Sequence, residues 1–123
     1  MKKADTELIM KSTEGIFSLS YVPQLYVEIQ TLRAKLERKI SFQVTFEDAL
    51  YSWYEEIYTP IMEGIKESNL VRKLKGSKSI AEIYFELYEE AEKSDFKKIP
   101  NVIYSYLKSH KRGFWSFLSP LSA

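Results

Sequence analysis

Apolar residues recur at steps of three and four along most of the chain, which is the spacing of an amphipathic α-helix with one buried face. Alternation of apolar and polar residues, which is typical of a half-buried strand, occurs clearly only over residues 40–46. The pattern therefore predicts an all-α fold with at most one short extended segment. We expect a small bundle of about four helices near residues 22–39, 46–69, 79–93 and 99–112.

The inward-facing positions of these helices define a predicted core. Burying their side chains removes a large apolar surface from water, which is the main favourable contribution to folding. The predicted core comprises Leu25, Ile29, Leu32, Leu36, Leu50, Trp53, Ile57, Ile61, Ile65, Ile83, Leu87, Val102, Ile103 and Tyr106.

The helix near residues 46–69 is the central element of the predicted bundle. Thr45 is placed to cap its first turn, and Asp48 follows near the positive end of the helix. Pro60 lacks an N–H and clashes with the carbonyl four residues before it. We therefore expect this helix to kink near Tyr58–Thr59.

Other boundaries follow from capping residues. Ser79 and Glu82 form a full capping box at the start of one helix, and Gly113 is placed to end the last helix near Arg112. Residues 1–15 are expected either to form a short helix that ends at Gly15 or to be disordered.

Two stretches have more than one interpretation. The apolar stripe of residues 22–39, with Glu28 among the polar residues on the opposite side, either packs on the chain's own core or pairs with a second copy. We favour the first. Residues 40–46 are expected to be an extended linker, from which Phe42 and Val44 insert into the core.

The composition is that of one globular domain, with 123 residues of which 45% are hydrophobic and 28% charged. We therefore expect residues 1–123 to form a single helical domain. The 18 Lys and Arg residues nearly balance the 17 Asp and Glu residues, unlike the basic excess of most nucleic-acid binders. No apolar run approaches the length of a membrane span, and the absence of cysteine fits a reducing compartment, so we expect a cytoplasmic protein.

Catalytic signatures are missing from the sequence. The chain has no cysteine, four glycines and a single histidine, His110, which has no partner that the sequence identifies. A nucleophile–base pair, a Gly-rich phosphate loop and a metal-ligand set are therefore all absent from the pattern. We predict no enzymatic activity, no cofactor and no metal site.

Aromatic residues make up 15% of the chain and provide candidate partner-binding positions. Tyr51, Tyr54 and Tyr58 lie on the central helix, where they form either a ring-lined groove or, as we favour, part of the core. The apolar tail of residues 113–123 carries the other candidates, Phe114, Trp115 and Phe117. This tail is expected to fold back on the helices, to make a dimer contact, to dock on a partner or to contact a membrane surface.

A basic region at residues 66–78 provides candidate phosphate contacts. We identify Arg72, Lys73, Lys75 and Lys78, although a solvated helix end is the favoured interpretation because the region has a single glycine.

Residues 40–84 contain a motif in two parts. It reads Asp48-Ala49-x-x-Ser52-Trp53-Tyr54-x-x-Ile57-Tyr58-x-Pro60-Ile61 and continues with Ser79-Ile80-Ala81-Glu82-Ile83-Tyr84. With this motif the segment resembles a helical segment of bacterial proteins of unknown function, some of which carry a ParB-like nuclease or a kinase-like domain. The similarity implies a helical accessory domain, and it carries over no catalytic residue. The Lys-rich loop departs from the pattern, and neither accompanying domain occurs in these residues.

Together these features predict a non-enzymatic helical interaction or regulatory domain that self-associates or binds another protein. The alternative is a nucleic-acid-associated accessory module that uses the basic region of residues 66–78.

Overall fold

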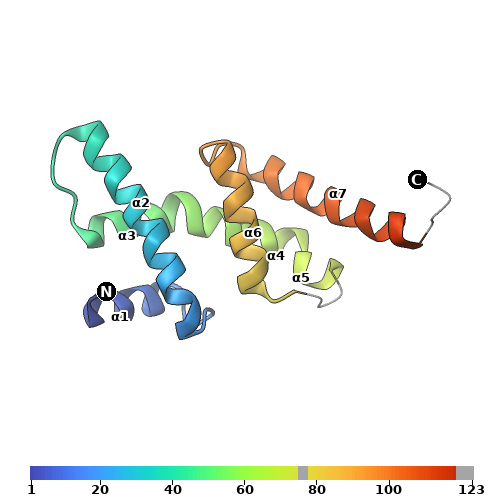
Figure 1. Cartoon of the computed structure of the whole chain (residues 1–123), viewed down its shortest axis with the longest axis horizontal. Helices are drawn as coiled ribbons and strands as arrows, with labels where there is room; N and C mark the ends of the chain where they lie inside the picture. Colours follow the sequence, from blue (N-terminus) through green and yellow to red (C-terminus); the bar gives the residue numbers. More distant parts are fainter. Residues whose placement is uncertain (75–77, 119–123) are drawn as a thin grey trace. The chain divides into compact units, whose positions relative to one another are not determined.

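The computed structural model of the chain describes residues 1–74 and 78–118, with side chains as far as Ser109. Helices dominate these residues and no strand occurs among them, which confirms the all-α prediction (Figure 1). The described residues contain more helices than the four expected, because a short helix at Lys3–Ser12 precedes the predicted set and another at Leu70–Lys73 lies between its second and third members.

The chain divides into two compact units, residues 1–59 and 60–123. The expected single domain over residues 1–123 stays a prediction. The N-terminal unit contains α1 (Lys3–Ser12), the 3₁₀ turn η1 (Leu19–Tyr21), α2 (Val22–Ile40), α3 (Phe46–Trp53) and the π-helical turn η2 (Tyr54–Tyr58). The C-terminal unit contains α4 (Thr59–Ser68, from Pro60 onward), α5 (Leu70–Lys73), α6 (Ile80–Lys93) and α7 (Ile99–Leu118).

In the N-terminal unit, α2 packs against α1 and α3. Ile9 of α1 and Phe17 of the following turn are fully buried, so this part of the chain contributes to the core. A short helix does form in residues 1–15, although it ends at Ser12 rather than at Gly15.

The linker between α2 and α3 contains no strand. Ser41 ends α2 in the left-handed conformation, with φ 58° and ψ 23°. Val44 is buried as expected, and its carbonyl accepts a hydrogen bond from Arg33 Nε at 2.6 Å. Phe42 is 75% exposed, so the prediction that it inserts into the core is wrong. Val44 is the one residue of 41–45 that is buried, so the linker places a single side chain in the core.

The central helix begins as predicted, because the Thr45 hydroxyl accepts a hydrogen bond from the Asp48 N–H at 3.1 Å. Its regular α-helical bonding is interrupted at Tyr54–Tyr58, where the turn is π-helical, and it resumes at Thr59. The Thr59 N–H bonds to the carbonyl of Tyr54, five residues back. The kink expected at Pro60 stays a prediction, and the disturbance that is observed precedes the proline.

In the C-terminal unit, the capping box at the start of α6 is confirmed. Ser79 Oγ accepts a hydrogen bond from the Glu82 N–H, and the Glu82 carboxylate accepts one from the Ser79 N–H. Helix α6 packs against α7, which continues beyond Gly113 rather than ending near Arg112. One glycine inside a helix costs only about 1 kcal/mol, which is too little to end it.

Most of the predicted core is buried. Leu32, Leu36 and Val102 are the exceptions, and these three are half-buried. The core also contains residues outside that set, of which Val44 and Tyr58 were expected there for other reasons. They are Ile9, Phe17, Val22, Val44, Ala49, Tyr58, Leu70, Ala81, Tyr84, Tyr88, Ala91 and Ile99.

Candidate interaction surface

The aromatic cluster on the central helix belongs mainly to the core. Tyr58 is buried, and its ring stacks on Trp53 and Tyr54 with centroid separations of 4.9 and 5.6 Å. Phe17 adds a tilted contact to Tyr58 at 6.1 Å. Tyr58 is therefore a core residue, and its assignment as a partner-binding residue is corrected.

The π-helical turn explains this stacking. Trp53 and Tyr58 are five residues apart, and in a regular α-helix side chains with that separation point to different sides. A π turn closes its hydrogen bonds over five residues, which brings positions i and i+5 onto one side. The π turn therefore places Trp53 and Tyr58 on the same side of the helix, where their rings can stack.

Burial raises the pKa of the Tyr58 hydroxyl above its usual range, and nearby Tyr54 and Glu14 act in the same direction. The phenol therefore stays protonated at neutral pH. An uncharged phenol inside a ring cluster contributes to the packing of the core.

The other tyrosines of this group differ in accessibility. Tyr54 is half-buried, whereas Tyr51 is 68% exposed. Among the three predicted tyrosines, Tyr51 is thus the one fully available to a partner. Phe114, Trp115 and Phe117 lie on α7, but their side chains fall outside the described residues, so their role stays a prediction.

The four candidate phosphate contacts of the basic region stay a prediction, and one of them already has a partner within the chain. Lys78 pairs with the Glu86 carboxylate, which also accepts a hydrogen bond from the Tyr106 hydroxyl. Lys75 lies outside the described residues. Arg72 and Lys73 are exposed on α5.

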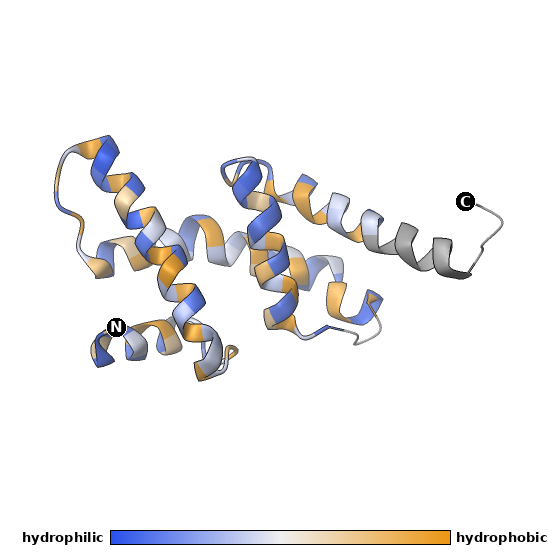
Figure 2. Cartoon of the chain, in the orientation of Figure 1, coloured by the Kyte–Doolittle hydropathy of each residue, from blue (hydrophilic) through white to orange (hydrophobic). Residues whose placement is uncertain are grey.

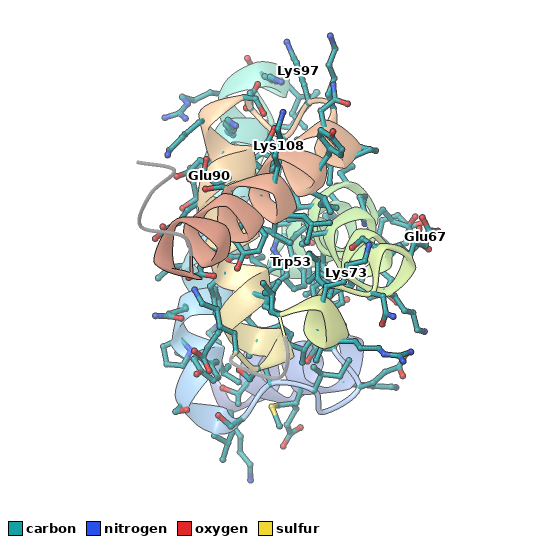
Figure 3. All side chains as sticks on the ribbon, turned by 90° about the vertical axis from the view of Figure 1, so that its right-hand side faces the viewer. Trp53, Glu67, Lys73, Glu90, Lys97 and Lys108 are labelled. Atoms are coloured by element: carbon teal, nitrogen blue, oxygen red, sulfur yellow. The ribbon has the colours of Figure 1, made fainter. Side chains whose placement is uncertain are left out.

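Nearby carboxylates further weaken the phosphate interpretation. Lys73 lines an open groove of about 580 Å³ together with Glu63 and Glu67 of α4. Figure 3 shows Glu67 at the surface of α4 and Lys73 on the neighbouring α5. Two acidic side chains beside one lysine repel a phosphate group, because like charges destabilise one another at short range.

A second groove, of about 880 Å³, lies along α6 and α7 and has a mixed charge. Glu89 and Glu90 line it together with Lys97 and Lys98. Glu90 and Lys97 are labelled in Figure 3.

Within the described ranges, no group of three or more histidine, cysteine, aspartate or glutamate residues is placed to hold a metal ion. In the same ranges, no helix is both long and apolar enough to cross a membrane.

Helix α2 presents a surface that sequence reasoning missed. From Ile16 to Ala34 every exposed side chain is uncharged, although 28% of the chain is charged. We call Leu19 of η1 together with Pro23, Val27 and Ala34 of α2, which recur at steps of four, four and seven residues, the neutral face. Figure 2 shows hydrophobic residues recurring along α2.

The two charged residues in this span are turned away from the neutral face. Glu28 is buried and accepts a hydrogen bond from Trp53 Nε1 at 3.1 Å. Arg33 is half-buried and donates to the Val44 carbonyl. Glu28 was expected on the solvated side of the helix, and that expectation is wrong. The signal available in the sequence was the low number of charges between residues 16 and 34.

No family model matches the chain, and comparison with curated proteins and with solved structures finds no similar protein. The resemblance of residues 40–84 to bacterial helical segments therefore stays a prediction. Functional inference for this protein starts from the geometry described above.

Proposed function

We propose that the protein is a non-enzymatic helical interaction domain that self-associates, with the neutral face of α2 as its contact surface. The observation that carries the proposal is that Glu28 is buried and Arg33 is half-buried against the Val44 carbonyl, so that every exposed residue from 16 to 34 is uncharged. Leu19 and Val27 on this face are 67% and 61% exposed.

A surface of this kind suits a protein contact. The centres of protein interfaces are depleted in charged residues, and homodimer interfaces are more apolar than the rest of the surface. A two-fold dimer places the same patch of both subunits in contact, so any charge on the patch meets its own copy. The neutral face has no such charge to desolvate or to repel.

The dimer is expected to be weak. One helix face buries less surface than the roughly 800 Å² per partner of a standard interface. We therefore expect an association that depends on concentration and reverses on dilution. Such a contact is typical of a regulatory domain whose state follows its own abundance, and we place this domain in the bacterial cytoplasm.

Sedimentation equilibrium of the full chain over a range of concentrations tests the proposal. Val27→Glu places a carboxylate on the neutral face and should shift the chain to monomer. Tyr104→Glu is the matched control, because Tyr104 is 67% exposed and lies on α7. If the unmodified chain is monomeric at every concentration, self-association is wrong.

Two further variants separate the remaining interpretations. Tyr51→Glu weakens the dimer only if the exposed tyrosine of α3 takes part in the contact. Arg72→Glu tests the nucleic-acid alternative, in which a fluorescent oligonucleotide should bind more weakly as salt concentration rises. Binding that is lost in Arg72→Glu, while Val27→Glu behaves as the unmodified chain, would favour the accessory-module alternative.

A further inference from the structure

We infer that the linker between α2 and α3 contacts the surface of a membrane that contains anionic lipids. The contact is made by residues 38–43, which we call the tip and which read Arg-Lys-Ile-Ser-Phe-Gln. All six of these residues are exposed. The inference goes beyond the proposed self-association and does not depend on it, because the tip lies outside the neutral face.

The tip exposes two large apolar side chains. Phe42 is 75% exposed, more than any other large apolar side chain in the described residues, and Ile40 is 51% exposed. Ser41, between them, adopts the left-handed conformation that ends α2. Leaving both side chains in water forgoes the free energy gained by burying them, so their exposure indicates a contact outside the chain.

The linker holds the tip in this outward position from its base. Val44, two residues after Phe42, is buried, and its carbonyl accepts the hydrogen bond from Arg33 of α2. The Thr45 hydroxyl then caps the first turn of α3. Both sides of the tip are therefore fixed to the N-terminal unit, and the exposure of Phe42 is a property of the folded linker.

Positive charge lies directly beside the apolar side chains. Arg38 and Lys39 are exposed in the last turn of α2. The nearest acidic residue before them, Glu37, is half-buried, and its carboxylate lies 3.8 Å from Arg33 Nε. The first acidic residue after the tip is Glu47, on α3. The tip therefore carries two cations and no anion, which favours a negatively charged partner.

A lipid surface suits this combination of side chains. Proteins bind at the surface of a membrane through apolar side chains that enter the interfacial layer and through cations that attract anionic headgroups. The interfacial layer requires no matching pocket. A stable protein interface uses roughly 20 to 30 residues on each side, which is far more than the tip provides.

A fluorescent label reports insertion of the tip, since the sequence contains no cysteine. Gln43→Cys in the full chain keeps Phe42 and carries an environment-sensitive dye. Tyr104→Cys is the matched control, because Tyr104 is 67% exposed and lies on α7. The probes are vesicles of phosphatidylcholine alone and vesicles in which phosphatidylglycerol replaces part of it. We expect a blue shift of the dye on Gln43→Cys with the anionic vesicles only, and no shift of the dye on Tyr104→Cys.

Sedimentation of the unlabelled chain with the same vesicles separates the apolar contribution from the charge. Phe42→Ser should lower the partition coefficient about tenfold, because it removes the largest apolar side chain of the tip. Arg38→Gln and Lys39→Gln should each lower it about fivefold, and added salt should weaken binding of the unmodified chain. Lys97→Gln and Lys98→Gln remove exposed cations before α7 and should leave binding unchanged.

Three results would overturn the inference. The first is a dye on Gln43→Cys that does not respond to anionic vesicles, and the second is equal binding by Phe42→Ser and the unmodified chain. The third is an equal loss of binding in the Lys97 and Lys98 controls, which would show attraction by net charge alone. The proposed self-association is tested without vesicles, so its outcome is separate from all three.

Discussion

Trp53 Nε1 donates a hydrogen bond to a carboxylate oxygen of Glu28 across 3.1 Å, and both residues are buried. The bond joins α3 to α2, two helices that pack against one another. It also holds a charged residue of α2 inside the N-terminal unit. One contact therefore contributes to the core and to the absence of charge on the neutral face.

Removing the indole N–H donor of Trp53 should lower the free energy of unfolding. Trp53→Phe keeps an aromatic ring but leaves a buried carboxylate with one donor fewer, so we expect a loss of about 3 kcal/mol in unfolding free energy. The same change should cost less in a Glu28→Leu background, where no buried carboxylate needs a donor. Urea denaturation followed by circular dichroism measures all four chains. Equal losses in both backgrounds would show that the hydrogen bond contributes nothing.

Gly64 of α4 lies close to Ile103 of α7. A Cβ at Gly64 would come within 1.8 Å of Ile103 Cδ1 and 3.3 Å of its Cγ1. Glycine to alanine in an open helix interior stabilises by about 1 kcal/mol. Here we expect Gly64→Ala to destabilise by roughly 1 to 2 kcal/mol, because the buried Ile103 must move.

The partner variant Ile103→Val removes the clashing Cδ1 and provides the control. In that background Gly64→Ala should be neutral or stabilising, as seen in thermal unfolding. We therefore expect the effect of Gly64→Ala on the unfolding free energy to change sign between the two backgrounds. A Gly64→Ala change that stabilises both backgrounds would contradict the close approach of the two residues.

Two buried tyrosines should make the protein sensitive to alkaline pH. Burial is the main cause that raises the pKa of Tyr58 and of Tyr106, and the hydrogen bond to Glu86 adds to it at Tyr106. In the unfolded chain these phenols ionise near their usual pKa of 10.0. Above that pH only the unfolded state releases these protons, so the unfolding free energy falls as pH rises.

Tyr58→Phe should therefore show a shallower decline in stability than the unmodified chain above about pH 10. Urea denaturation at several pH values measures the slope. Tyr51→Phe is the matched control, since this exposed phenol has no burial to lose. Identical slopes for Tyr58→Phe and the unmodified chain would show that Tyr58 ionises normally.

Left-handed backbone positions provide a paired test. Ser41 has φ 58° at the end of α2, and Gly15 has φ 71° after α1. Glycine adopts this conformation without the Cβ clash that other residues suffer. We expect Ser41→Gly to stabilise by about 0.5 to 1 kcal/mol and Gly15→Ala to destabilise by about 1 kcal/mol. A lower melting temperature for Ser41→Gly, or a higher one for Gly15→Ala, would contradict the left-handed conformations of these two residues.

Periodicity in the sequence predicted the longer helices because their stripes are set by local spacing. The Ser79 capping box and the Thr45 cap were equally readable, since each depends on residues within one turn. Glu28 was misplaced for the opposite reason. Its position on the helix lies at the edge of the apolar stripe, and its partner Trp53 is 25 residues away in the chain.

The candidate site was less accessible to prediction. The neutral face depends on Glu28 being buried against Trp53 and on Arg33 being half-buried against the Val44 carbonyl, and each contact joins α2 to a later segment of the chain. In the basic region, the pairing of Lys78 with Glu86, eight residues further on, was likewise not predicted. Sequence spacing identifies which residues share a helix face, whereas partners from other elements decide which charges remain exposed.

The π-helical turn of Tyr54–Tyr58 has a consequence for the length of the chain. A π turn contains one residue more than an α-helical turn. Deleting the exposed Glu55 or Glu56 would place Trp53 and Tyr58 four residues apart, and an ordinary α-helix would then keep their rings together. The turn therefore has the form of a one-residue insertion that preserved the ring stack. Related sequences are expected in two lengths, with the gap between Trp53 and Tyr58.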